Sequence, residues 1–214
     1  RPPLPTTKEK MSDTQSGPGR LLYLRMGATS MVNPQSPALG AVTHIDAYDF
    51  ADADLSGVSG ILISMAVDQQ FLGTQAGKFE EFIHRGGRVA VMGHPVVKFL
   101  PKQGDFRKLD YAAPTELYLS PGDPHPVWAG VDFLDVSARR GITGFYARGY
   151  TLNHPAGAII ASRIGPERLP ADYVYAHGRG RVLIHPGIEV GVFAGDGNTA
   201  ARIHPQLIDW LMSR

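Results

Sequence analysis

The sequence contains no cysteine among its 214 residues. This absence excludes disulfide bonds, thiolate metal sites and any mechanism in which a cysteine thiolate is the nucleophile. It is compatible with a reducing compartment. Because the N-terminal residues also lack an apolar signal region, we expect a cytoplasmic protein.

An excess of charge of one sign is also missing. The chain has 21 Lys and Arg against 20 Asp and Glu, and charged residues make up 19% of it. Such a balance supplies no bulk field for a nucleic acid or an anionic membrane, so neither is expected as a partner. No apolar run approaches the ~20 residues of a membrane span. The expected partner is therefore a small-molecule ligand or another protein.

The length and the hydrophobic content of 43% suit one domain with a buried core. Residues 1–19 are rich in proline, glycine and polar side chains and have little to bury, which predicts a flexible N-terminal arm. The domain is placed over residues 20–214. A neighbouring subunit, as in a homo-oligomer, is the expected reason for any order in the arm.

The first half of the domain holds continuous apolar runs, which are predicted as strands at residues 21–26, 44–50, 60–67 and 88–92. Strands with apolar residues at every position are typical of a parallel sheet covered on both faces. Residues 70–85 place Phe79, Phe82 and Ile83 on one helical face, and Gly86 follows as a stop signal. This order predicts a βαβ unit.

The second half is less regular, with short strands expected at residues 115–119, 142–146 and 158–164. A further strand at residues 181–184 and a C-terminal amphipathic helix at residues 200–212 complete the pattern. The predicted fold class is α/β, a three-layer sandwich with a mainly parallel central sheet.

Four segments carry a resemblance to a known family: residues 53–57 before the strand at Gly60, the helix end at 82–87, the strand 89–93 leading into His94, and residues 180–185. Their order resembles the class I glutamine amidotransferase-like (flavodoxin-like) superfamily, and within it the ThuA-like, trehalose-utilisation type of domain. The resemblance extends from about residue 20 to the C-terminus.

The resemblance implies a fold and a pocket location. Working amidotransferases of this family carry a nucleophilic cysteine in the turn after the central strand, and a His and a Glu near the late strand. The matching residues here are His94 at the turn, and His185 with Glu189 at the late strand. An imidazole cannot form the glutamyl thioester, and His185 and Glu189 depart from the family's His-x-Glu spacing. Glutaminase activity is therefore not expected, and no cofactor is implied.

Parallel sheets bind ligands beyond the carboxyl ends of their strands, which directs attention to the polar residues at these ends. Candidate acid or base residues are Asp68, His94, His185 and Glu189. Two imidazoles and a carboxylate would suit zinc or iron, but no HxH or HExxH spacing is present and no metal is expected. Candidate ligand-binding residues are Gly27, Ala28, Gln69, Gly93, Arg139, Arg140 and Arg148, the arginines as clamps for a carboxylate or phosphate.

Three functions remain open from the sequence. The first is a non-thiol amidotransferase-like domain that binds a small polar molecule or a partner protein. The second is a hydrolase or isomerase acting on a sugar-like polar metabolite, with His94 and His185 as acid and base. The third is a structural subunit of a complex. Mutual placement of His94, His185 and Asp68 separates the first two, because acid/base catalysis needs these groups free and within reach of one ligand.

Overall fold

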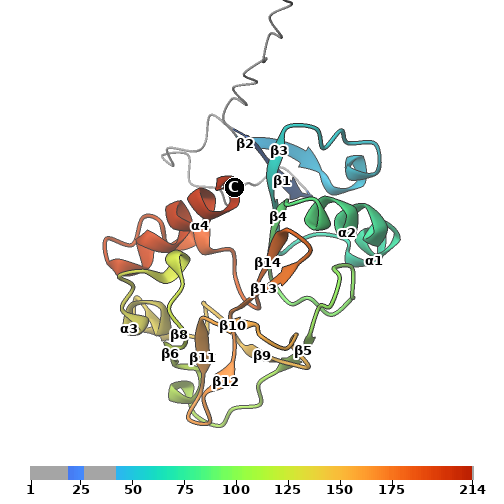
Figure 1. The fold of residues 1–214 in the computed structure, drawn as a ribbon. Coiled ribbons are helices and arrows are strands. Elements are labelled where there is room, and N and C mark those ends of the chain that lie inside the picture. Colours follow the sequence, from blue (N-terminus) through green and yellow to red (C-terminus); the bar gives the residue numbers. More distant parts are fainter. Residues whose placement is uncertain (1–18, 27–41, 214) are drawn as a thin grey trace, which may run out of the picture.

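The central feature of the computed structural model is a seven-stranded sheet of order β10-β13-β14-β4-β3-β1-β2 (Figure 1). The structure describes residues 19–26 and 42–213, so the predicted arm lies outside it apart from Gly19. The strands are β1 (Arg20–Arg25), β2 (Val42–Asp46), β3 (Val58–Ile63), β4 (Arg88–Met92), β10 (Ile159–Ile160), β13 (Tyr173–His177) and β14 (Gly180–His185). The pairs from β2 to β14 are parallel, whereas β13 and β10 are antiparallel additions. The fold is therefore α/β with a mostly parallel sheet.

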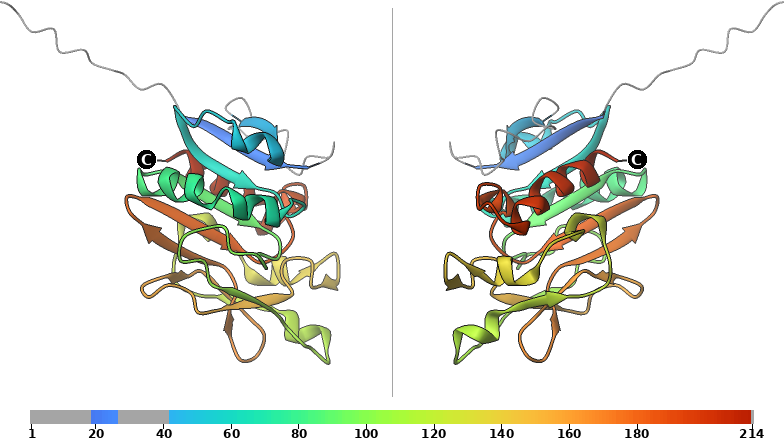
Figure 2. Two further views of the ribbon diagram at one scale, coloured as in Figure 1. Left: turned by 90° about the vertical axis from the view of Figure 1, so that its right-hand side faces the viewer. Right: turned by 90° about the vertical axis from the view of Figure 1, so that its left-hand side faces the viewer.

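Helices cover both faces of this sheet (Figure 2). One face packs against α1 (Gln69–Thr74) and α2 (Ala76–His84), and the other against α4 (Ile203–Met212). Successive residues of a strand point to opposite faces, so Leu22 joins the core under α2 while Leu21 joins the core under α4. The continuous apolar runs follow from this double coverage. Phe79, Phe82 and Ile83 are buried, which confirms the predicted helical face.

Most of the remaining short strands lie beyond the β10 and β13 edge of the central sheet (Figure 1). A three-stranded sheet joins β6 (Leu119–Pro121), β11 (Ser162–Ile164) and β12 (Leu169–Pro170). Two smaller pairs are β5 (Asp105–Lys108) with β9 (Gly149–Leu152), and β7 (Ala138–Arg139) with β8 (Ile142–Thr143). The helical turns are η2 (Ala47–Ala51), η3 (Pro114–Leu117), η4 (Pro126–Trp128), α3 (Phe133–Ser137), η5 (Val190–Phe193) and η6 (Thr199–Arg202).

The strand expected at 142–146 is only Ile142–Thr143, the one at 158–164 is two short strands, and the C-terminal helix begins at Ile203. Three further predicted elements differ from the structure for local reasons. The strand expected at 44–50 ends at Asp46, because the Asp46 carboxylate accepts the Tyr48 N–H and starts η2. The strand expected at 115–119 is mostly η3, which begins at Pro114 and is closed by the Glu116 side chain on the Ala113 N–H. The single helix expected at 70–85 is divided into α1 and α2 at Gln75.

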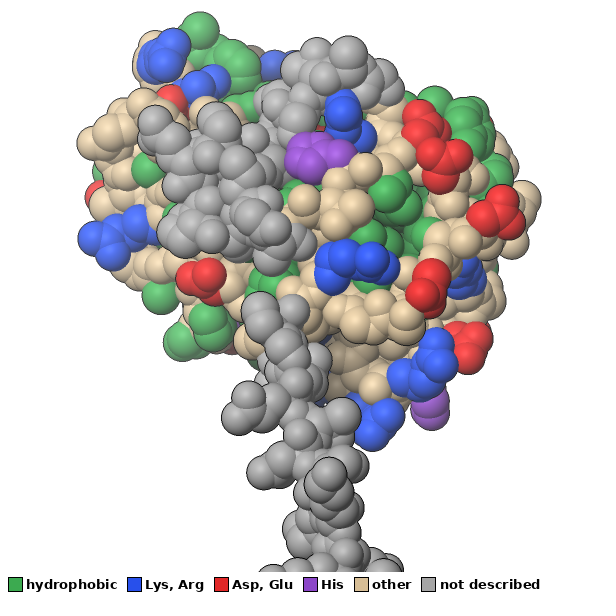
Figure 3. Space-filling model, turned by 90° about the horizontal axis from the view of Figure 1, so that it is seen from above, with side chains coloured by type: hydrophobic (Ala, Val, Ile, Leu, Met, Phe, Trp, Pro, Cys, Tyr) green, Lys and Arg blue, Asp and Glu red, His purple; other side chains and the backbone are tan. Residues whose placement is uncertain are grey.

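Charged side chains of both signs are interspersed on the face seen in Figure 3, with no large patch of one sign among its coloured residues. This agrees with the balanced composition of the chain. Within residues 19–26 and 42–213, no helix is long and apolar enough to cross a membrane.

Two histidines, His125 beside α4 and His204 within it, make the stability of this layer dependent on pH. Burial lowers the pKa of both His125 and His204 to about 4. Between about pH 6.5 and pH 4 these histidines are protonated in the unfolded chain but neutral in the folded chain. The free energy of unfolding is therefore highest above pH 6.5 and falls as the pH drops towards 4. Acidification from pH 7 to pH 5 is expected to remove about 1–2 kcal/mol per histidine after allowance for partial solvation.

Urea unfolding at the two pH values measures this effect. The variant His204→Leu should show a smaller loss than the original chain, because one of the two protonation sites is gone. An identical loss in both proteins would show that His204 does not resist protonation in the folded state.

Candidate functional site at the carboxyl edge of the sheet

Two of the candidate histidines leave the sheet at the same edge. Strands β4 and β14 are parallel neighbours with His185 opposite Met92, and His94 follows two residues later. The His94 ring is exposed and stacks on Phe106 with 4.5 Å between ring centroids. Partial burial of the ring lowers the His94 pKa, and the positive charges of His185, Arg148 and Lys108 lower it further. The exposed cations near His94 are Arg148 and Lys108.

The conformationally demanding residue of the turn after β4 is Gly93, not His94. Its φ of +96° lies where L side chains are rarely found. A Cβ at this position would lie 2.8 Å from the Met65 Cβ, and the Gly93 N–H already donates to the Gly187 carbonyl at 2.7 Å. The tight turn to which the family resemblance points therefore holds a residue with no side chain and no space for one.

His185 is enclosed and both of its ring nitrogens are occupied. Nδ1 lies 2.6 Å from Asp172 Oδ1, and Nε2 lies 2.8 Å from the Ile188 carbonyl oxygen. Since a carbonyl only accepts, Nε2 carries a proton, and a second proton is held between Nδ1 and the Asp172 carboxyl. With the imidazole fully buried, His185 has no nitrogen available to a ligand.

Asp172 is the centre of a buried network that the sequence analysis missed. Its Oδ2 accepts the Tyr146 hydroxyl at 2.6 Å and the Ser162 hydroxyl at 2.5 Å, and Tyr146 in turn accepts Trp128 Nε1–H at 2.7 Å. Burial and then the Asp172 charge raise the Tyr146 pKa well above its usual value. The available signal was a lone acidic residue directly before the apolar run of β13, which only a burial argument would have selected.

Glu189 is likewise a buried structural contact. One carboxylate oxygen accepts the Tyr23 hydroxyl at 2.8 Å and the other accepts the Met65 N–H at 3.0 Å. Glu189 therefore ties the loop after β14 to β1 and to the end of β3. A cavity of only about 10 Å³ adjoins it, beside His204, so there is no space for a substrate.

Asp68 and Gln69 shape the loops at this edge. The Asp68 carboxylate caps α1 by accepting the Phe71 N–H at 3.0 Å, and it accepts the Tyr48 hydroxyl at 2.9 Å; these bonds lower its pKa. Gln69 donates to the His94 carbonyl at 2.8 Å and so fixes the His94 loop. Among the described residues, no hydrogen bond joins Asp68 to His94 or to His185.

The candidate arginines have different surroundings. Arg139 is paired with Asp196 through bonds of 2.6 and 2.9 Å, so its guanidinium makes a structural ion pair. Arg140 is exposed, 3.7 Å from the same carboxylate. Arg148 is also exposed and donates one bond, to the Gly144 carbonyl.

Gly27 and Ala28 lie outside the described residues. In the described part of the chain, no group of three or more His, Asp or Glu side chains is arranged to hold a metal ion.

Neither a protein-family model nor a curated protein sequence matches the chain significantly. Solved structures with a similar fold include the cytoplasmic protein STM3548 from Salmonella typhimurium, at a TM-score of 0.59 and 13% identity, covering 91% of this chain and 100% of that one. The cytoplasmic protein STM1381 from Salmonella typhimurium LT2 matches at a TM-score of 0.58 and 10% identity, with the same coverage. A beta-galactosidase from Rahnella sp. R3 matches at 0.50 and 13% identity, over 92% of this chain and 32% of its own. Likeness at these identities concerns the fold.

Proposed function

We propose that this chain is a non-thiol glutamine amidotransferase-like domain of the ThuA-like type, which binds a small polar molecule or a partner protein and does not hydrolyse glutamine. The observation that carries the proposal is the turn after β4. Its Gly93 has a φ of +96° and a Cβ there would lie 2.8 Å from the Met65 Cβ, while the next residue, matched to the family's cysteine, is the imidazole of His94, which forms no thioester. Covalent catalysis of the amidotransferase kind needs a nucleophile at such a position.

The acid and base candidates support the same proposal. His185 and Glu189 are buried, and their polar atoms are bonded within the protein. A general base must reach the proton that it removes, so neither residue is placed to act on a ligand. The alternative of a hydrolase or isomerase would then depend on His94 alone, without the second imidazole that it requires.

Binding is proposed at the exposed cationic surface formed by His94, Arg148 and Lys108. Exposed carboxyl ends of parallel strands are the usual ligand side of such sheets. Arg148 and Lys108 both act electrostatically on the His94 ring, and both side chains are exposed. A ligand or protein segment with negative charge suits this surface best. The cytoplasmic location expected from the sequence belongs to this proposal.

A glutamine hydrolysis assay with a sensitive ammonia readout tests the absence of glutaminase activity. We expect no ammonia release above the uncatalysed rate from the intact chain, because no side chain can form the acyl intermediate. Release of ammonia that is abolished by His94→Ala would overturn the proposal.

Binding is tested separately by following the His94 ring signals in an NMR titration with citrate and with glucose, as an anionic and an uncharged probe. We expect citrate to shift these signals. In Arg148→Met the affinity for citrate should fall about tenfold, since a charge-assisted hydrogen bond is lost. Arg163→Met, which removes a half-buried arginine from β11, is the charge-matched control. Equal weakening in both variants would show that only net charge is sensed.

A further inference from the structure

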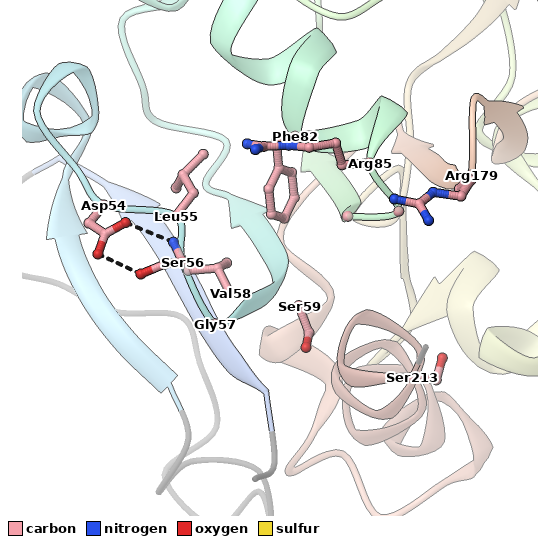
Figure 4. Close-up of a pocket in the computed structure, with 12 residues that line it drawn as sticks. Asp54, Leu55, Ser56, Gly57, Val58, Ser59, Phe82, Arg85, Arg179 and Ser213 are labelled. Atoms are coloured by element: carbon pink, nitrogen blue, oxygen red, sulfur yellow. Dashed lines mark hydrogen bonds between the residues drawn. The ribbon is translucent and has the colours of Figure 1, made fainter. Parts of the chain in front are cut away.

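The amino edge of the sheet, opposite the His94 surface, carries a cavity of about 670 Å³. It lies where β3, β4 and β14 begin. Figure 4 shows Arg85, Phe82 and Arg179 along one side and the turn of residues 54–57 along the other, with Ser213 at the end of α4 beside them. None of these residues belongs to the surface proposed above.

Two guanidinium groups at this cavity are weakly neutralised. The Arg179 guanidinium has no hydrogen bond or ion pair with any described residue. Arg85 has one partner, Glu81, at 3.5 Å, and both side chains are more than 60% exposed. An exposed pair of this kind contributes little and exchanges readily with solvent or a ligand. Arg179 is therefore available to an anion, and an anion can compete with Glu81 for Arg85.

The end of α2 does not account for these charges. Arginines near a helix C-terminus often cap its free carbonyl groups. Here the last carbonyls of α2 already accept backbone N–H groups: Glu81 from Arg85, Phe82 from Gly87, Ile83 from Gly86 and His84 from Arg179. Backbone N–H groups thus satisfy the carbonyls at the end of α2, and neither guanidinium group is needed to cap the helix.

The carboxylate in the cavity does not neutralise the arginines either. Asp54 accepts the Ser56 N–H at 2.8 Å and the Ser56 hydroxyl at 2.6 Å, and these bonds hold its pKa below the usual value. The positive charges that act on Asp54 are those of Arg20 and Lys78. The Asp54 charge is thus stabilised by its own turn and by Arg20 and Lys78.

The cavity also offers an apolar floor. Gly87 lies flat against the Phe82 ring, since a Cβ there would be 2.3 Å from a ring carbon. The ring borders the cavity together with Leu55 and Val58, and the Ser59 hydroxyl supplies a polar group beside them. An apolar surface next to one unpaired guanidinium group and one in an exposed ion pair fits a ligand with a charged end and a nonpolar body.

We propose that this cavity is a binding site for a small organic oxyanion, a carboxylate or a phosphate monoester with an apolar body. The Arg179 guanidinium holds the oxyanion, Arg85 adds to the positive field, and the apolar body lies against Phe82. Planar guanidinium groups suit both oxyanions because their paired N–H donors match two oxygens at once.

Isothermal titration calorimetry with phenyl phosphate, benzoate and inorganic phosphate tests the proposal on the full chain. We expect phenyl phosphate or benzoate to bind with a Kd below about 1 mM, and inorganic phosphate at least about tenfold more weakly because it lacks the apolar body. The tighter of the two aromatic probes identifies the class of oxyanion. Absence of binding by both at about 10 mM would overturn the proposal.

Variants locate the binding. Arg179→Met should weaken the tighter probe at least about tenfold, whereas Arg181→Met should leave it unchanged. Arg181 lies two residues further along, in β14, donates to the Gly180 carbonyl and does not line the cavity, so it controls for charge and position. Thermal midpoints establish that both variants fold. Equal weakening in Arg179→Met and Arg181→Met overturns the proposal. So does a result in which His94→Ala loses binding while Arg179→Met binds the probe normally, which would instead support binding at the carboxyl-edge surface.

Discussion

Replacement of Asp172 by asparagine is expected to lower the free energy of unfolding by about 3–5 kcal/mol, the usual effect of removing one partner from a buried charged network. Asp172 is fully buried and serves His185, Tyr146 and Ser162 at once. The Tyr146 hydroxyl already accepts the Trp128 N–H, so its single proton needs an acceptor on residue 172. An asparagine oxygen can still accept both hydroxyls, but an amide N–H then replaces the carboxylate oxygen that faces His185 Nδ1, so the charge-assisted Asp172–His185 bond is lost.

Urea denaturation monitored by tryptophan fluorescence measures this loss, because Trp128 belongs to the network. Asp110→Asn is the matched control: Asp110 is exposed, and its replacement should change stability by less than about 0.5 kcal/mol. The double variant Asp172→Asn/His185→Gln should be less destabilised than the sum of the two single variants, since the residues share one bond. Additive effects would mean that the Asp172–His185 contact is not energetically coupled.

Gly93→Ala is the second large effect, with an expected loss of about 2–4 kcal/mol from backbone strain together with overpacking. The added Cβ would meet the Met65 Cβ at 2.8 Å and its Cα at 2.9 Å, so backbone must move to relieve the contact. The Gly93 N–H bond to Gly187 holds the two loops together and restricts that movement.

Two other glycines separate the causes of this loss. Gly141 also has a positive φ, +79°, but a Cβ there would meet nothing within 4 Å, so Gly141→Ala measures strain alone. Gly195→Ala has neither strain nor contact and serves as the baseline. If Gly93→Ala is no worse than Gly141→Ala, the turn has space for a side chain, and the main support for a non-thiol binding domain is lost.

The strands at the centre of the sheet could be predicted because each contains an unbroken run of apolar residues. Burial on both faces requires such a run, and β1, β4 and β14 have one between their polar ends. The short elements of the second half could not be located as well, because capping contacts such as Asp46 on Tyr48 decide where a strand stops. The antiparallel strand β13 was not predicted, although it lies beside β14 and carries the residue after Asp172.

For the candidate site, the sequence predicted which residues end strands but not which of them are free. His94 and His185 both follow central strands, and the structure leaves the first exposed while it encloses the second. Arg139 and Arg148 were equally good binding candidates in the sequence. In the structure, however, Arg139 forms an ion pair with Asp196, which is distant along the chain. These differences arise from partners far away in sequence, which local patterns do not contain.

By itself, the sequence determined that thiol chemistry is absent, that the charge is balanced, and that central strands lie between two apolar layers, because composition and periodicity carry this information. Only the tertiary structure decided the chemistry of the edges. It placed Met65 against Gly93, gathered Asp172 with three distant donors, and left Arg179 unpaired beside a cavity. The physical reason is that the availability of a polar group depends on its burial and on its hydrogen-bond partners, and most of these partners are brought together by long-range folding.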